Sequence, residues 1–258
     1  MWDPEQEEFF IGYAPPMPPR LARFVTRTVI GIACVILLLA VTLAAGHVPL
    51  EGGTFEFGYP KSFSGTIVER PYPGLRLDGV DSNVEPWPPL LVAPGKHGAD
   101  RLVSGLDGRH VTLTGTRIQR GSHTMIEVEP ESLVSKASES GSIKATALLE
   151  RSDKGLVELT GEIVDSKCFL GVMVPGSGNT HKECASLCLR GGIPPALYVQ
   201  DRAGHSTLLL LAGPTGEPIG APALQAAGEA ISLSGSIQRQ GGWLVLRTDP
   251  SSWHRVDR

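Results

Sequence analysis

The chain has 258 residues, of which 41% are hydrophobic and 19% charged, and its formal net charge is −4. This composition excludes a disordered chain and a protein with many membrane spans. The acidic balance gives no electrostatic basis for nucleic-acid binding, so we expect no nucleic acid among the partners. The 31 Gly and 21 Pro residues favour turns and short strands over long helices.

Residues 29–46 form an apolar run without a charged side chain. A helix of that length is about 27 Å long, enough to cross the core of a lipid bilayer. Three arginines precede the run: Arg20, Arg23 and Arg27. The positive-inside rule therefore predicts a transmembrane helix over 28–46, a cytoplasmic tail over 1–27, and the rest of the chain outside the cytoplasm. The long acidic N-terminal segment favours an uncleaved anchor over a signal peptide.

Segments of the chain recur further along, which indicates an internal repeat. The matching pairs are 64–70 with 160–166, 89–95 with 208–214, and 111–121 with 231–241. Apolar residues alternating with polar ones predict strands at 64–70, 74–79, 89–93, 110–119 and 124–129, and again at 156–165, 196–201, 205–212, 229–239 and 242–248. Each copy has a short predicted helix before its last two strands, at 98–107 and at 220–228.

Three strands, a helix and two strands follow the order of the OB-fold, a small Greek-key barrel. The predicted fold class is mainly β: a single N-terminal transmembrane helix, then two tandem OB-fold-like barrels, the second with a helical insertion that carries Cys and His. The predicted boundaries are a juxtamembrane linker 47–61, a first OB-like domain 62–130, a linker 131–155, a second OB-like domain 156–250 and a tail 251–258.

The insertion, residues 166–195, contains every cysteine outside the apolar run. Its four candidate ligands are Cys168, His181, Cys184 and Cys188, in the spacing C-x12-H-x2-C-x3-C. Thr180 and Glu183 predict a capping box with His181 as the first helical residue. The helical period then places the last three candidates on one face, within reach of Cys168.

A metal site is the first interpretation of this cluster. A Cys3His set suits tetrahedral zinc, and thiolates with Met173 or His181 beside them suit copper. An iron–sulfur cluster with one His ligand is a further option, which an oxidising compartment disfavours. Asp165 is expected to hold His181 in place through a hydrogen bond.

Two other interpretations remain open. Cys168 could form a disulfide with Cys184 or Cys188, which would leave one free thiol outside the cytoplasm. Alternatively, the cysteines could exchange disulfides, because Cys184 lies near a helix N-terminus that favours its thiolate.

The strings at 161–171 (GEIVDSKCFLG), 181–188 (HKECASLC) and 191–194 (GGIP) resemble a motif of bacterial membrane-anchored proteins of uncharacterised activity, carried on OB-fold-like domains. This resemblance implies the Cys/His site and no particular reaction. The C-x3-C pair is also similar to that of the copper chaperones of cytochrome oxidase. Those proteins have a thioredoxin fold and a Pro after the pair, whereas this chain has Leu189.

No catalytic motif or pair of carboxylates stands out, so the chain is not expected to be an enzyme. The expected function is that of an accessory protein of the bacterial inner membrane, with its barrels in the periplasm. It would bind a metal or redox cofactor through the Cys/His cluster and assist or anchor a respiratory redox complex. The alternatives are a structural subunit stapled by a disulfide and a thiol–disulfide exchange protein.

Overall fold

The computed structural model describes residues 17–46, 52–79, 88–135, 154–201, 203–240 and 243–256. Parts of the predicted N-terminal tail (1–16), juxtamembrane linker (47–51) and linker between the barrels (136–153) lie outside the described residues. The chain divides into two compact units, 1–50 and 51–258, which are described in turn.

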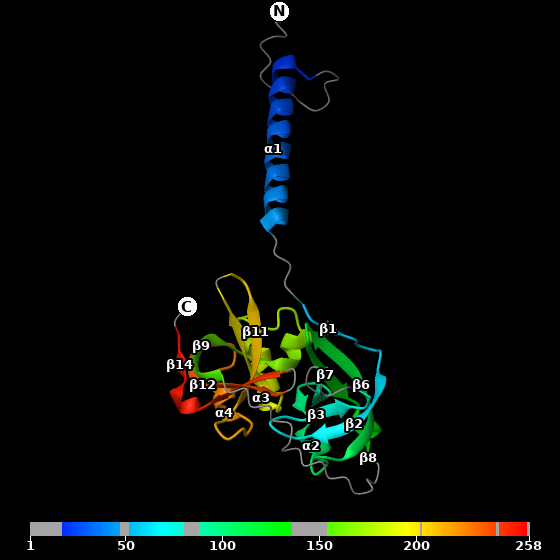
Figure 1. The fold of residues 1–258 in the computed structure, drawn as a ribbon. Helices are drawn as coiled ribbons and strands as arrows, with labels where there is room; N and C mark the ends of the chain where they lie inside the picture. Colours follow the sequence, from blue (N-terminus) through cyan, green and yellow to red (C-terminus); the bar gives the residue numbers. More distant parts are fainter. Residues whose placement is uncertain are drawn as a thin grey trace, which may run out of the picture. The chain divides into compact units, whose positions relative to one another are not determined.

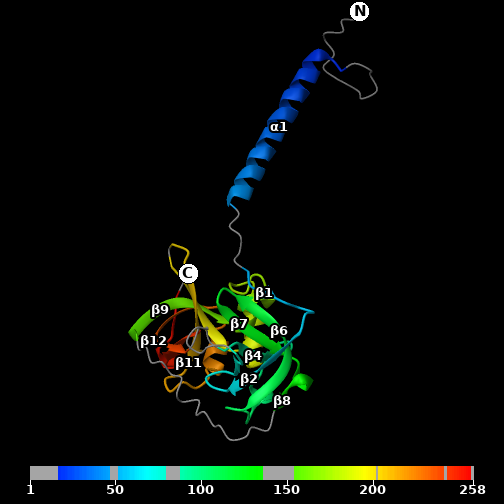
Figure 2. The same ribbon diagram turned by 45° about the vertical axis from the view of Figure 1, so that its right-hand side comes forward.

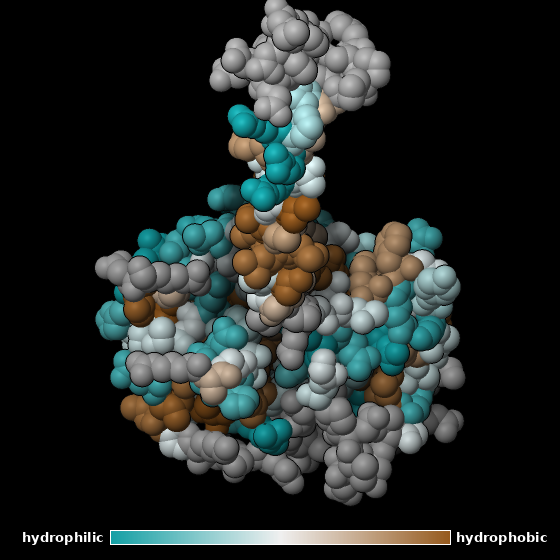
Figure 3. Space-filling view, turned by 90° about the horizontal axis from the view of Figure 1, so that it is seen from above, coloured by the Kyte–Doolittle hydropathy of each residue, from teal (hydrophilic) through white to brown (hydrophobic). Residues whose placement is uncertain are grey.

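The first unit contains one apolar helix, α1 (Pro19–Gly46), with no buried residue among its 28. Its mean hydropathy reaches 2.8, so it is long and apolar enough to cross a membrane. It begins nine residues before the predicted start at 28, because Pro19 suits the first helical position. In Figure 3 the apolar part of α1 is brown and its N-terminal end is teal.

The second unit is built mainly of strands, and strands make up 41% of the structure. Its first part comprises β1 (Thr54–Phe55), β2 (Lys61–Val68), β3 (Gly74–Leu77), β4 (Leu90–Ala93), β5 (His97–Gly98), α2 (Asp100–Val103), β6 (His110–Arg120), β7 (His123–Val128), η1 (Pro130–Ser132) and β8 (Val134–Ser135). Its second part comprises β9 (Lys154–Asp165), η3 (Cys168–Val172), α3 (Lys182–Arg190), β10 (Pro195–Gln200), β11 (Ser206–Ala212), α4 (Ala221–Gln225), β12 (Ala230–Gln240), β13 (Trp243–Thr248), η4 (Pro250–Ser252) and β14 (His254–Arg255).

These strands close two barrels of five strands each. The first barrel runs β2–β3–β4–β7–β6 and back to β2, with only the β4–β7 pair parallel. The second runs β9–β10–β11–β13–β12 and back to β9, with only the β11–β13 pair parallel. The two barrels therefore share one strand order, and they lie side by side in Figures 1 and 2.

Glycine permits close strand contact at the same point of each barrel. A Cβ on Gly115 of β6 would lie 2.5 Å from the side chain of Ile126, and one on Gly235 of β12 would lie 2.3 Å from the carbonyl oxygen of Arg247. Both distances are too short for any side chain. These two glycines therefore let neighbouring strands approach closely where each barrel closes.

The barrels also pack against each other. In β4, Leu91 points into the first barrel, whereas Leu90 and Val92 belong to a core shared with the second barrel. In β11, Leu209 and Leu211 likewise face the inside of their own barrel, and Leu208 and Leu210 face the shared core. These strands are apolar on both faces because both faces are buried.

Polar contacts cross the same interface. The Tyr72 hydroxyl donates to the carbonyl of Leu211 at 2.5 Å and accepts from the backbone N–H of Ile219 at 3.2 Å. The His123 ring lies against Trp243, with centroids 4.5 Å apart. The interface therefore contains directional hydrogen bonds and ring contacts as well as apolar packing.

Several short elements differ from the prediction. The helix expected at 98–107 is only the four residues of α2, preceded by β5 and ended by Gly105, whose φ is +78°. The helix expected at 220–228 is the five residues of α4. The predicted linkers and tail contain β1, β8 and β14, which extend the sheets by pairing with β6 or β12.

Candidate metal centre

The insertion between β9 and β10 is fixed by Asp165, the last residue of β9, which is fully buried. One carboxylate oxygen accepts the backbone N–H of Cys168 at 2.8 Å, and the other lies 2.8 Å from Nε2 of His181. The predicted hydrogen bond between Asp165 and His181 is therefore present. A single side chain holds the start of η3 and the start of α3 together.

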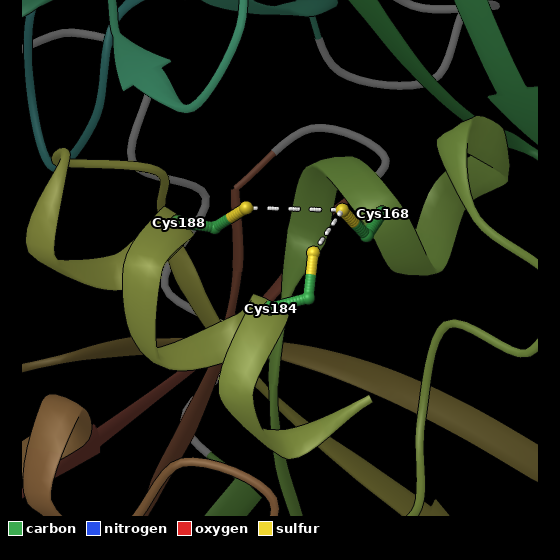
Figure 4. A group of neighbouring side chains, drawn as sticks. All are labelled: Cys168, Cys184 and Cys188. Atoms are coloured by element: carbon green, nitrogen blue, oxygen red, sulfur yellow. Dashed lines mark hydrogen bonds between the residues drawn. The ribbon is translucent and has the colours of Figure 1, made fainter. Parts of the chain in front are cut away.

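Three thiols converge from these two elements, with Cys168 on η3 and Cys184 and Cys188 on α3 (Figure 4). The Sγ of Cys168 lies 3.9 Å from that of Cys184 and 3.8 Å from that of Cys188. Cys168 and Cys188 are buried and Cys184 is half-buried, and all three are free thiols. The proposed disulfide between η3 and α3 is therefore not formed in this structure.

Helix α3 begins one residue later than predicted. His181 is the N-cap, its carbonyl accepts the N–H of Ala185 at 2.9 Å, and no side chain caps the helix there. The expected capping box of Thr180 and Glu183 is wrong, because Thr180 lies inside a backbone turn in which His181 donates to the carbonyl of Gly178, and the helix starts after it.

The predicted ligands do not all lie in one group. The ligand atoms of Cys168, Cys184 and Cys188 lie within 4.8 Å of one another, and those of Asp165, Cys168 and His181 form a second such group. Cys168 therefore joins the thiols to the imidazole. Met173 follows η3 with 45% of its surface exposed, and its backbone N–H donates to the carbonyl of Cys168 at 3.3 Å.

The first barrel adds a cation that sequence reasoning missed. The ammonium of Lys96, on the loop between β4 and β5, lies 2.8 Å from Sγ of Cys184 and 3.7 Å from Sγ of Cys188. Backbone contact holds this loop in place, since the N–H of Gly98 donates to the carbonyl of Gly191 at 2.9 Å. The end of α3 thus meets the first barrel beside the thiols.

A second missed lysine fastens the insertion to the first barrel. Lys167 is 2% exposed, and its ammonium donates to the carbonyls of Ala93 at 2.9 Å and Gly95 at 2.6 Å and forms an ion pair with Glu127. Three acceptors therefore match the three protons of the ammonium. A buried lysine needs such partners, because an unpaired buried charge is strongly destabilising.

Hydrogen bonds among these groups shift their pKa values. The hydrogen bond between the Cys168 and Cys188 thiols lowers the pKa of Cys188. The same bond, with burial, raises the pKa of Cys168. The hydrogen bond to Cys184 raises the pKa of Lys96 and so keeps its ammonium charged. Negative charge is therefore favoured on the sulfur of Cys188, whereas Cys168 stays a neutral thiol.

The spacing of the thiols suits a single metal ion. Thiolates bound tetrahedrally to zinc at about 2.3 Å have sulfurs about 3.8 Å apart, and the two measured distances are 3.8 and 3.9 Å. The three cysteines, with Asp165 and His181 beside them, could therefore hold a metal ion.

Comparison of the chain with protein-family profiles, curated proteins and solved structures found no match.

Proposed function

We propose that this protein binds one soft metal ion, zinc or copper, through Cys168, Cys184 and Cys188. The observation that carries the proposal is the convergence of three free thiols from two elements at the spacing of ligands around one ion. Three thiolates would supply soft donors that hold the ion tightly.

His181 is the proposed fourth ligand. Its Nε2 lies 2.8 Å from the Asp165 carboxylate, which leaves Nδ1 for a metal. A carboxylate that holds a ligating histidine in this way fixes the ring orientation and raises its basicity. Met173 is a weaker candidate, because nearly half of its surface is exposed.

We further propose that each barrel is an OB-fold and that the two form a tandem pair. The shared strand order, with its single parallel pair, supports this assignment. The arginines at the N-terminal end of α1 support an anchor with its N-terminus in the cytoplasm and both barrels in the periplasm of a bacterial inner membrane. There the protein would assist or anchor a respiratory redox complex without catalysing a reaction itself.

Metal content tests the central proposal. The full chain, extracted from its membrane without chelators, is expected to carry about one equivalent of zinc or copper by plasma mass spectrometry. Cys188→Ser is expected to lose most of that metal while circular dichroism stays unchanged. Cys34→Ser is the matched control, because Cys34 belongs to α1 in the other compact unit and is not among the three converging thiols. Metal at background in the unmodified chain would refute the proposal.

One observation favours thiol–disulfide exchange as a second candidate. The hydrogen bond between Cys168 and Cys188 lowers the pKa of Cys188, and the two sulfurs are 3.8 Å apart. A lowered pKa favours the thiolate that attacks a disulfide. In this case the metal-free protein is expected to reduce one equivalent of a disulfide substrate while Cys168 and Cys188 form a disulfide, and to turn over only when a dithiol such as dithiothreitol is added to reduce that disulfide again. Cys188→Ser is expected to abolish the reaction.

A further inference from the structure

The three thiols lie in the second barrel, but the nearest cation comes from the first. Lys96 reaches Cys184 and Cys188 from a loop that is 88 residues earlier than the first of them. Two buried charged groups beside the thiols have other partners: Asp165, at the end of β9, contacts His181, and Lys167 contacts Glu127. Lys96 is thus the cation in direct contact with the thiols among the described residues.

Charge explains why a cation belongs at this position. Three thiolates around a divalent ion form a complex with one net negative charge. Two of the sulfurs belong to buried residues, so solvent stabilises that charge poorly. One ammonium in hydrogen-bond contact makes the group neutral.

The structure also shows how Lys96 is kept in place. Lys167 holds the carbonyls of Ala93 and Gly95, which lie three residues and one residue before Lys96 in the chain. The Gly98–Gly191 hydrogen bond fixes the loop on the other side. Because Lys167 also precedes Cys168, one side chain links the first thiol to the loop that carries the cation.

We propose that Lys96 is the counter-ion of a divalent metal–thiolate complex, so that the site is completed only by the first barrel. This inference rests on the proposed metal binding and adds to it a residue that sets the affinity of the site without being a ligand. The favoured ion is divalent. Three thiolates and one ammonium together carry two net negative charges, and a divalent ion neutralises them.

Substitutions at position 96 test the role of charge in the full chain. The measurement is the zinc dissociation constant, obtained by competition with a chromophoric chelator. Lys96→Arg is expected to stay within a few-fold of the unmodified chain, whereas Lys96→Met is expected to weaken binding about 10- to 100-fold and Lys96→Glu more. Lys182→Met is the matched control: it removes the same charge from α3, but Lys182 pairs with Glu229.

A spectrum separates a counter-ion from a ligand. Cobalt(II) bound in place of zinc reports its ligands, so its absorption bands are expected to be the same in the Lys96→Met variant as in the unmodified chain. Changed cobalt bands, or zinc affinities that do not fall in the order Lys96→Arg, Lys96→Met, Lys96→Glu, would overturn the assignment of Lys96 as the counter-ion. The proposal that the thiols bind a metal would be unaffected by that result. If the unmodified chain binds neither zinc nor cobalt, the proposed function itself fails, and this inference with it.

Discussion

The substitution Gly191→Ala tests the contact between the barrels, because two physical arguments predict opposite effects on the free energy of unfolding. Gly191 ends α3 with φ −77° and ψ −3°, a conformation that alanine adopts without strain. Considered alone, the substitution should stabilise the protein by about 0.4–1 kcal/mol, because alanine restricts the unfolded chain.

The neighbouring barrel reverses this expectation. A Cβ on Gly191 would lie 1.7 Å from the carbonyl oxygen of Lys96, so the two backbones must move apart. That movement breaks the 2.9 Å hydrogen bond between Gly98 and Gly191. Overpacking and the loss of this bond together cost about 2–5 kcal/mol, which exceeds the gain in the unfolded state.

Urea unfolding of the full chain in detergent, followed by circular dichroism, measures this difference. Gly191→Ala is expected to lower the midpoint clearly. Gly155→Ala is the control, because no atom lies within 4 Å of a Cβ built there. A Gly191→Ala variant as stable as the unmodified chain would refute the close contact between α3 and the loop that carries Lys96.

Two further substitutions examine the same interface. Tyr72→Phe leaves the carbonyl of Leu211 and the N–H of Ile219 without their partner, so we expect the free energy of unfolding to fall by about 2–4 kcal/mol. The control is Tyr59→Phe, which should change the free energy of unfolding little because Tyr59 is 74% exposed. Burial lowers the pKa of His123 below its ordinary value of 6.5, so the unfolded chain takes up a proton more readily than the folded one. Stability should therefore fall as the pH drops below 6.5, and His123→Gln should make urea midpoints at pH 7.5 and 5.5 more alike; an unchanged pH dependence would contradict this role.

Much of the strand structure could be predicted, because alternation of apolar and polar residues is a local signal. The apolar runs at 89–93 and 208–212 indicate, besides two strands, where the two barrels meet. Their lack of alternation indicates burial on both faces, which is the signature of the interface between the barrels.

The candidate site was predictable in part. The spacing of Cys168, Cys184 and Cys188 brings the thiols together through one helix and one turn, and the structure places them in contact. Lys96 could not be found in this way, because its position depends on how two barrels pack across 88 residues of chain. A lysine in a Pro–Gly–Lys turn has no local feature that distinguishes it from any solvated surface lysine.

The shared core between the barrels has a consequence for how the protein folds. Met125 of one barrel and Trp243 of the other are buried in the same cluster, together with the thiols Cys168 and Cys188. Neither barrel can open without exposing apolar surface on its neighbour, so residues 51–258 are expected to behave as one cooperative unit. A destabilising substitution in the first barrel would therefore disrupt the arrangement of the three thiols by unfolding both barrels together, even where the substituted residue contacts no sulfur.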